Sequence, residues 1–109
     1  MTRAIRSHLV LTAAVFLASA VCFAESPGEA TYKARCQSCH GATGTPSAGM
    51  TRATGVKPVS DPAIKKLTAA QMFASTKNGK GKMKPVTGLT DAQIRESVTF
   101  YRSFLNPQP

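Results

Sequence analysis

The apolar residues near the carboxyl end of this chain recur at the spacing of an α-helix. Four of them fall at i, i+4, i+7 and i+11 on one helical face: Ile94, Val98, Tyr101 and Leu105. The sequence TDAQ at 90–93 precedes them and has the form of a capping box, which satisfies the first free N–H groups of a helix. Asn106 and Pro107 follow as a stop signal. The pattern predicts a final helix with one face against a core.

Two further helices are indicated by the residues that begin them. The sequence SPGE at 26–29 is a capping box with proline at the first helical position, and it predicts a helix over 27–36. The sequence TAAQ at 68–71 is another capping box, and the Asn-Gly pair at 78–79 ends the helix that it begins.

The remaining segments predict one short helix and two loops. A short helix beginning at Asp61 carries Ile64 and Leu67. Residues 41–60 are rich in Gly, Thr, Ser and Pro without strand alternation, which predicts a long loop, and 80–89 is a second loop. A long loop in a compact domain needs something to wrap around. We therefore expect one all-α domain whose loops surround a centre.

The amino-terminal segment has the parts of a secretory signal peptide. A basic start precedes an apolar run at 9–21, and small residues follow up to Ala24. We expect residues 1–24 to be removed on export to the periplasm, which leaves a domain over 25–109. Cleavage after Ala20 also fits.

Two other roles for this segment fit less well. The apolar run is short for a membrane span of about 20 residues, which weakens the interpretation as a retained anchor. A lipid on Cys22 is weaker still, because that modification requires an apolar and a small residue where Ser19 and Val21 stand.

The charge balance narrows the class of partner. The chain has 14 lysines and arginines against 5 acidic residues, a net charge of +9. Loss of Arg3 and Arg6 with the signal peptide leaves +7. Such a surface favours acidic proteins, nucleic acid or anionic membranes. Nucleic acid is the weakest of these for an exported chain whose basic residues are not interleaved with aromatic ones.

The predicted domain is too small to be stabilised by its own core. A domain of this size with few large apolar side chains usually needs disulfides, a metal or a bound cofactor. Of the three cysteines, Cys22 lies in the predicted signal peptide, and Cys36 and Cys39 alone are no disulfide framework. We expect a bound group to complete the core.

The segment CQSCH at 36–40 has the pattern C-x-x-C-H, the attachment signature of c-type haem. One helical turn places the two thiols beneath two vinyl groups of one porphyrin, where each forms a thioether. The next residue then presents its imidazole to the iron from the same side. We expect one haem, attached through Cys36 and Cys39, with His40 as an axial ligand of the iron.

Two other uses of this motif are weaker. A thioredoxin-like redox pair expects a preceding strand and an α/β pattern, and the sequence predicts neither. A structural zinc site needs four ligands, and no cysteine or histidine follows His40.

With this motif the chain resembles the class I monohaem c-type cytochromes of bacteria, including the small cytochrome c5-, c551- and c6-like proteins. The resemblance covers residues 28–105. It rests on these segments: Gly28 with Tyr32, CQSCH at 36–40, NGKGKMKP at 78–85, and LTDAQI at 89–94.

The resemblance implies a small cytochrome c fold, in which three to four helices and their loops surround one covalently bound haem. The first and last helices cross, Gly28 allows their close approach, and Phe100 or Tyr101 packs near the crossing. The haem-ligating histidine of this family often donates its second ring N–H to a loop carbonyl near a proline, for which Pro46 and Pro58 are both candidates.

The second axial ligand is sought among the methionines. The other histidine, His8, lies in the predicted signal peptide, which excludes a pair of histidine ligands in the mature chain. Met72 lies within a predicted helix and is more typical of a core residue, whereas Met50 lies in the first loop and is a distant second candidate.

Met83 is the preferred second ligand. Gly79 and Gly81 precede it and allow the backbone to approach a porphyrin, while Pro85 stiffens the loop after it. Its place between the last two helices also matches the ligand methionine of the family. Methionine with histidine raises the reduction potential of haem iron.

Four lysines surround Met83 in the sequence: Lys77, Lys80, Lys82 and Lys84. If Met83 binds the iron, their ammonium groups lie around the haem edge and form a docking surface for an acidic redox partner. An ordinary solvated loop is the other interpretation.

These expectations favour an electron-transfer protein over an enzyme. With both axial positions filled by protein, the iron exchanges single electrons between a reductase or dehydrogenase and an oxidase or other acceptor. The alternative is a haem-based sensor or ligand-binding protein with a displaceable sixth ligand. A third class, a thiol oxidoreductase, requires Cys36 and Cys39 to be free thiols.

Overall fold

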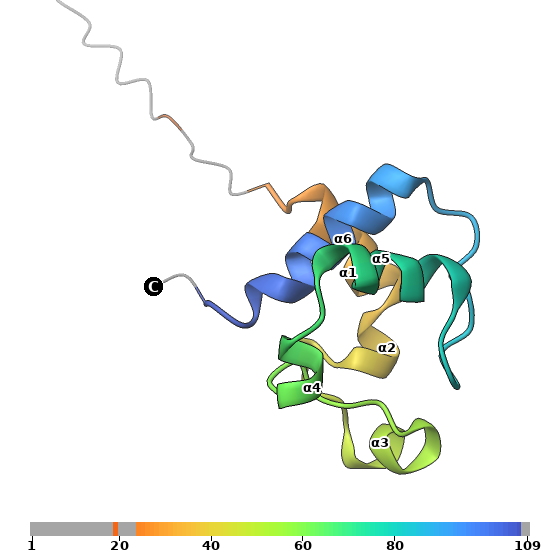
Figure 1. Ribbon diagram of the computed structural model, residues 1–109. Coiled ribbons are helices and arrows are strands. Elements are labelled where there is room, and N and C mark those ends of the chain that lie inside the picture. The colour runs from red at the N-terminus through yellow and green to blue at the C-terminus, as the bar shows by residue number, and fades with distance from the viewer. Residues whose placement is uncertain (1–18, 20–23, 108–109) are drawn as a thin grey trace, which may run out of the picture.

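The computed structural model describes residue 19 and residues 24–107 of the chain. The predicted signal peptide at 1–24 lies almost entirely outside these residues and stays a prediction. The described part contains helices α1 (Pro27–Arg35), α2 (Gln37–His40), α3 (Ala48–Thr54), α4 (Pro62–Lys65), α5 (Ala69–Asn78) and α6 (Asp91–Ser103) (Figure 1). Its only β-type pairing is an isolated bridge between Lys80 and Met83. The predicted all-α class is confirmed.

The helices begin where the capping residues predict. In α5 and α6 the hydroxyls of Thr68 and Thr90 each accept the N–H of the third helical residue, whose glutamine side chain accepts the threonine N–H in return. In the capping box of α1, only one of the two side-chain hydrogen bonds forms. Ser26 Oγ accepts from the N–H of Glu29 at 3.2 Å, but the Glu29 carboxylate pairs with Lys33 at 3.0 Å.

The prediction of a structureless loop over 41–60 is wrong, because α3 lies within it. Ser47 Oγ accepts from the N–H of Met50 at 3.1 Å and caps the start of α3, and Gly55 ends it with a φ of +73°. No residue of α3 is buried. A helix without a buried face leaves no apolar stripe in the sequence, and only its two caps mark it.

The core forms where α5 meets α6. Met72, Ile94 and Val98 are buried, and five partly buried side chains pack against them: Ile64, Leu67, Phe73, Leu89 and Tyr101. The predicted apolar face of α6 is therefore present, although the helix ends at Ser103 and half-buried Leu105 lies beyond it. None of the described helices is both long and apolar enough to cross a membrane.

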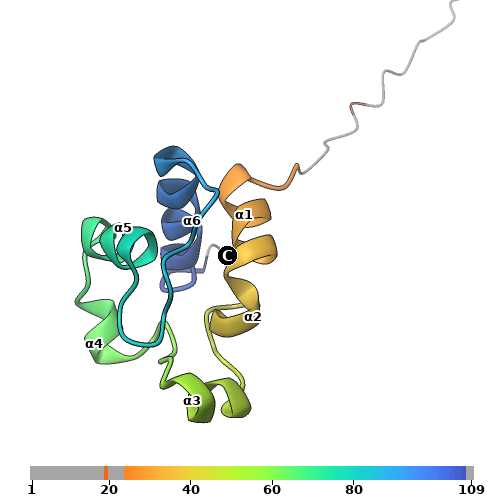
Figure 2. The ribbon, with the colours of Figure 1, turned by 90° about the vertical axis from the view of Figure 1, so that its right-hand side faces the viewer.

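Helices α1 and α6 are in contact, as the resemblance implies: they cross in the view of Figure 1 and lie side by side in that of Figure 2. A Cβ atom at Gly28 would overlap the backbone carbonyl of Glu96, so only glycine permits this approach. Next to the crossing, Tyr32 is 1% exposed, and its ring centroid lies 5.4 Å from Phe100 and 6.0 Å from Tyr101. Both predicted aromatic residues therefore pack there.

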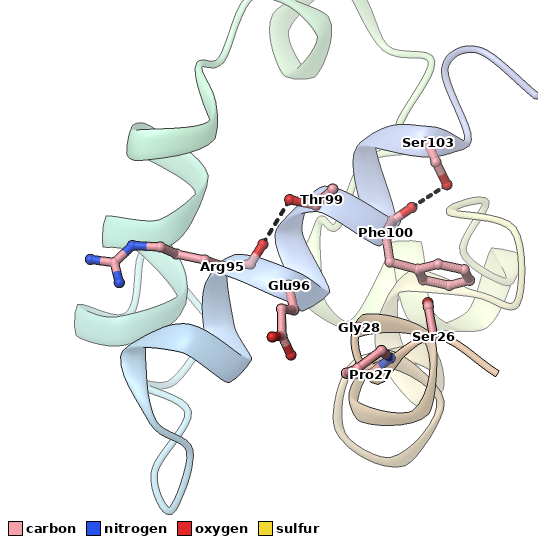
Figure 3. Close-up of a pocket in the computed structure, with 8 residues that line it drawn as sticks. All are labelled: Ser26, Pro27, Gly28, Arg95, Glu96, Thr99, Phe100 and Ser103. Carbon is pink, nitrogen blue, oxygen red and sulfur yellow. Dashed lines mark hydrogen bonds between the residues drawn. The ribbon is translucent and has the colours of Figure 1, made fainter. Parts of the chain in front are cut away.

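A crevice of about 440 Å³ lies beside this crossing, between the start of α1 and α6 (Figure 3). Its two hydroxyls on the last turns of α6 are already used within that helix. Thr99 Oγ1 donates to the carbonyl of Arg95 at 3.0 Å, and Ser103 Oγ donates to the carbonyl of Phe100 at 2.6 Å. The crevice is thus a junction between α1 and α6 in which these two hydroxyls serve the helix itself.

We predict that Gly28→Ala destabilises the haem-loaded protein by about 1–3 kcal/mol, because the added methyl group forces α1 and α6 apart. Urea unfolding followed by circular dichroism measures this change. Gly49→Ala is the matched control, since a Cβ at Gly49 in α3 meets nothing within 4 Å. It should leave stability unchanged or raise it by roughly 0.5–1 kcal/mol. Equal stability of the two variants would contradict the close crossing.

Candidate haem site

The end of α1 and the start of α2 share one residue, Cys36. It has a φ of −120° and a ψ of −36°, and its N–H donates to the carbonyl of Tyr32 at 2.8 Å. Its own carbonyl accepts from the N–H groups of Cys39 at 3.2 Å and His40 at 3.0 Å. The motif therefore forms one helical turn, which Gly41 ends with a φ of +84°.

The two thiols and the imidazole of this turn line one cavity of about 750 Å³. This size lies within the range of pockets that hold small molecules and cofactors. Met83, from the loop between α5 and α6, lines the same cavity. The structure thus brings together all four residues that the sequence singles out: Cys36, Cys39, His40 and Met83.

The walls of the cavity that α4, α5, α6 and the segment between α4 and α5 provide are largely apolar. They include Ile64, Leu67, Met72, Val98 and Tyr101. The buried hydroxyls among the lining residues are already used: Thr76 Oγ1 donates to the carbonyl of Met72, and Ser97 Oγ to that of Ile94, each at 2.9 Å. An apolar cavity of this kind suits a flat hydrophobic macrocycle better than a polar substrate.

The surroundings of His40 favour the state that a metal ligand requires. Burial lowers the pKa of its imidazole, which favours the neutral form. Its ring stands edge-on to Tyr101, with centroids 5.5 Å apart. The buried Nδ1 atom has no hydrogen-bond partner in the described part of the chain. The carbonyl acceptor expected near Pro46 or Pro58 is therefore not found.

The two cysteines do not have the properties of a redox-active thiol pair. They are not joined in a disulfide, and Cys36 is half-buried while Cys39 is exposed. Burial raises the pKa of the Cys36 thiol. The charge of Arg35 opposes this in part, and Cys39 adds a smaller increase. Catalytic thiols need the opposite, a lowered pKa that supplies thiolate. The buried surroundings of Cys36 therefore do not favour the thiolate that a thiol oxidoreductase needs.

Met83 lies in a tight turn that its own backbone closes. The N–H of Lys80 donates to the carbonyl of Met83 at 2.9 Å, and the N–H of Met83 donates to that of Lys80 at 3.0 Å. Gly79 begins the turn with a φ of +80°, and a Cβ there would lie 2.8 Å from Pro85 Cδ. This glycine allows the turn to fold back on Pro85.

The other two methionines differ from Met83 in their surroundings. Met72 also lines the cavity, but it is 7% exposed and belongs to the core beside Ile94 and Val98. Met50 lies in α3 and is not among the residues that line the cavity. Among the methionines of the described residues, only Met83 lies both in the cavity wall and in a loop outside the core.

Three of the four predicted lysines lie at the cavity: Lys80, Lys82 and Lys84. Lys77 does not line it. Its ammonium group pairs with Asp91 at 2.8 Å and lies 5.7 Å from the centre of the Phe73 ring. Lys57, which the sequence did not single out, also lines the cavity. Lys57, Lys80, Lys82 and Lys84 are called the cavity lysines below.

Sequence reasoning missed two more parts of the site. Residues 54–57, at the end of α3 and just after it, form part of the cavity wall. Arg35 lines the cavity and donates to the carbonyl of Thr87 at 2.8 Å, so it ties the end of α1 to the loop of Met83. For residues 54–57, the only sequence signals were the caps of α3 at Ser47 and Gly55. No sequence pattern indicated Arg35.

Comparisons with known proteins agree with this site. Residues 24–100 match the family model described as "Cytochrome C oxidase, cbb3-type, subunit III". Among solved structures, the chain is similar to "KustC0563 c-type cytochrome", with a TM-score of 0.63 and 24% sequence identity. That similarity covers 71% of this chain and 95% of the other and shows a shared fold. No curated protein sequence matches the chain.

The C-x-x-C-H turn, the apolar cavity and the imidazole that lines it fit one covalently attached porphyrin, and the family match spans most of the chain. The protein therefore belongs to the cytochrome c family described as cbb3-type cytochrome c oxidase subunit III, and it carries covalently bound haem c.

Proposed function

We propose that this protein is a periplasmic electron-transfer protein that carries one electron on a haem iron ligated by His40 and Met83. Cys36 and Cys39 hold the haem through thioether bonds, and the signal peptide at 1–24 exports the chain. The observation that carries the proposal is the single cavity lined by these four residues, which come from the α1–α2 turn and the α5–α6 loop.

The bound haem supplies an iron that cycles between its ferrous and ferric states. His40 and Met83 occupy its two axial positions in this proposal, so no substrate reaches the metal and electrons pass through the haem edge. The soft thioether of Met83 favours ferrous iron and raises the reduction potential. The protein then receives an electron from a reductase or dehydrogenase and gives it to an oxidase or other acceptor.

The finer family assignment is also part of the proposal. The Gly28 crossing and the NGKGKMKP segment support a class I monohaem cytochrome of the c5, c551 or c6 type. The family description supports service in a terminal oxidase chain, either as a subunit or as a free carrier.

The cavity lysines support an acidic redox partner. Lys57, Lys80, Lys82 and Lys84 are exposed, and in the described residues none of them pairs with a carboxylate. Positive charge around the haem edge attracts an acidic protein and orients it for transfer.

We predict that Met83→Ala removes the methionine–iron charge-transfer band of the ferric protein and lowers its reduction potential, because the thioether ligand is lost. Optical spectroscopy and redox titration measure both effects. Met50→Ala is the control and should retain the band and the potential. Reduced wild-type protein should not bind carbon monoxide promptly, whereas reduced Met83→Ala should. Prompt binding by the wild type would instead indicate the sensor, and loss of the band in Met50→Ala would reassign the ligand.

We predict that the double variant Lys57→Gln/Lys84→Gln reduces ferricyanide about two- to tenfold more slowly than wild type at low salt, because the anion is less attracted to the haem edge. Stopped-flow absorbance measures the rate. The variant Lys65→Gln/Lys66→Gln removes the same charge at residues that do not line the cavity and should change the rate much less. The difference should vanish at high salt. An equal effect of the two variants would argue against a localised docking surface.

A further inference from the structure

One hydrogen bond joins two walls of the haem cavity that are distant in the sequence. Lys82 Nζ donates to the backbone carbonyl of Ala53, in the last turn of α3, at 3.1 Å. Residues 80–84 form the wall that carries Met83, and residues 54–57 form the wall that begins directly after Ala53. The bond therefore links the methionine loop to the end of α3.

Little else holds α3 against the methionine loop. No residue of α3 is buried, and its other hydrogen bonds in the described part of the chain are local, such as Thr54 Oγ1 to the carbonyl of Met50 at 2.8 Å. Both ribbon views place α3 at the end of the domain opposite the start of α1 (Figures 1 and 2). In the described part of the chain, the bond from Lys82 is thus the hydrogen bond that connects α3 to the methionine loop.

The charge of Lys82 suits this bond. The last carbonyls of a helix lack intrahelical partners and carry a partial negative charge, which favours a cation beside them. Ala53 is the residue before the last one of α3, so its carbonyl belongs to this free group. An ammonium donor gives a stronger bond to such a carbonyl than a neutral side chain would.

We propose that Lys82 is a positioning residue that straps the Met83 loop to α3 and so limits how often the sixth axial position opens to external ligands. The proposal rests on the proposed ligation of iron by Met83. It assigns to Lys82 a role that Lys80 does not share. Lys80 lies in the same turn and lines the same cavity, but no hydrogen bond from it to α3 occurs in the described part of the chain.

Imidazole binding to the ferric protein tests the strap. Imidazole reaches the iron only after Met83 leaves, so its binding rate at saturation reports the opening of the loop. Lys82→Ala should raise this rate about two- to tenfold, the effect expected for loss of one hydrogen bond. Lys80→Ala removes an equal charge from the same turn but leaves the bond to Ala53 in place, so it measures the effect of charge alone and should raise the rate less than Lys82→Ala does. Lys82→Arg keeps a cationic donor and should restore the wild-type rate.

Two results would overturn the strap. One is an equal rate in Lys82→Ala and Lys80→Ala, which would make charge rather than the bond responsible. The other is a rate in Lys82→Arg as high as in Lys82→Ala, which would show that a donor at this position has no effect.

Amide hydrogen exchange of the haem-loaded protein tests the strap independently of the iron. The N–H groups of Met83 and Gly55, bonded at 3.0 and 2.8 Å to Lys80 and Thr51, should exchange faster in Lys82→Ala than in Lys80→Ala. If these amides exchange faster in Lys82→Ala but the wild-type ferric protein has no methionine–iron band, the role of Lys82 is supported and ligation by Met83 is contradicted. If the two variants exchange equally and the wild-type protein has that band, the role of Lys82 is contradicted and ligation by Met83 is unaffected.

Discussion

The rest of the structure depends on one constraint, which is that the apolar walls of a cavity of about 750 Å³ have to be kept from water. The described part of the chain buries only five hydrophobic side chains: Tyr32, Val59, Met72, Ile94 and Val98. Protein interiors tolerate few voids larger than a water molecule. A covalently attached haem satisfies the constraint, because it supplies the missing apolar surface and cannot leave. The helices then act as walls around it, and the cofactor takes the place of a larger core.

Covalent attachment and axial ligation make different demands on the chain, and different segments meet them. Attachment needs a rigid spacing, which the single turn from Cys36 to His40 provides next to the close crossing of α1 and α6. The proposed second ligand lies in a loop that hydrogen bonds and glycine conformations hold, rather than core packing. In the proposed ligation, His40 belongs to a turn beside the close crossing of α1 and α6, whereas Met83 belongs to an adjustable loop. This division suits a carrier whose haem stays attached while its axial environment is tuned.

Most of the fold could be predicted from the sequence because its signals are local. Capping boxes depend on residues three apart, the C-x-x-C-H turn depends on five consecutive residues, and Gly28 marks a crossing that the family resemblance supplies. The failures come from features without a local signal. Helix α3 has no buried face, and Lys77, close to Met83 in sequence, is carried by α5 toward Asp91. Contacts such as Lys82 with Ala53 join residues far apart in the chain, so no pattern in the sequence could indicate them.

The central claim is that one porphyrin is bonded to the sulfurs of Cys36 and Cys39 and fills the cavity. The most direct measurement is the intact mass of the exported protein, produced with haem maturation and extracted with acidic acetone before analysis. The account predicts the mass of the processed polypeptide plus one haem, and the bare polypeptide mass when both cysteines are replaced by serine. A wild-type protein with only the mass of its amino acids would contradict it.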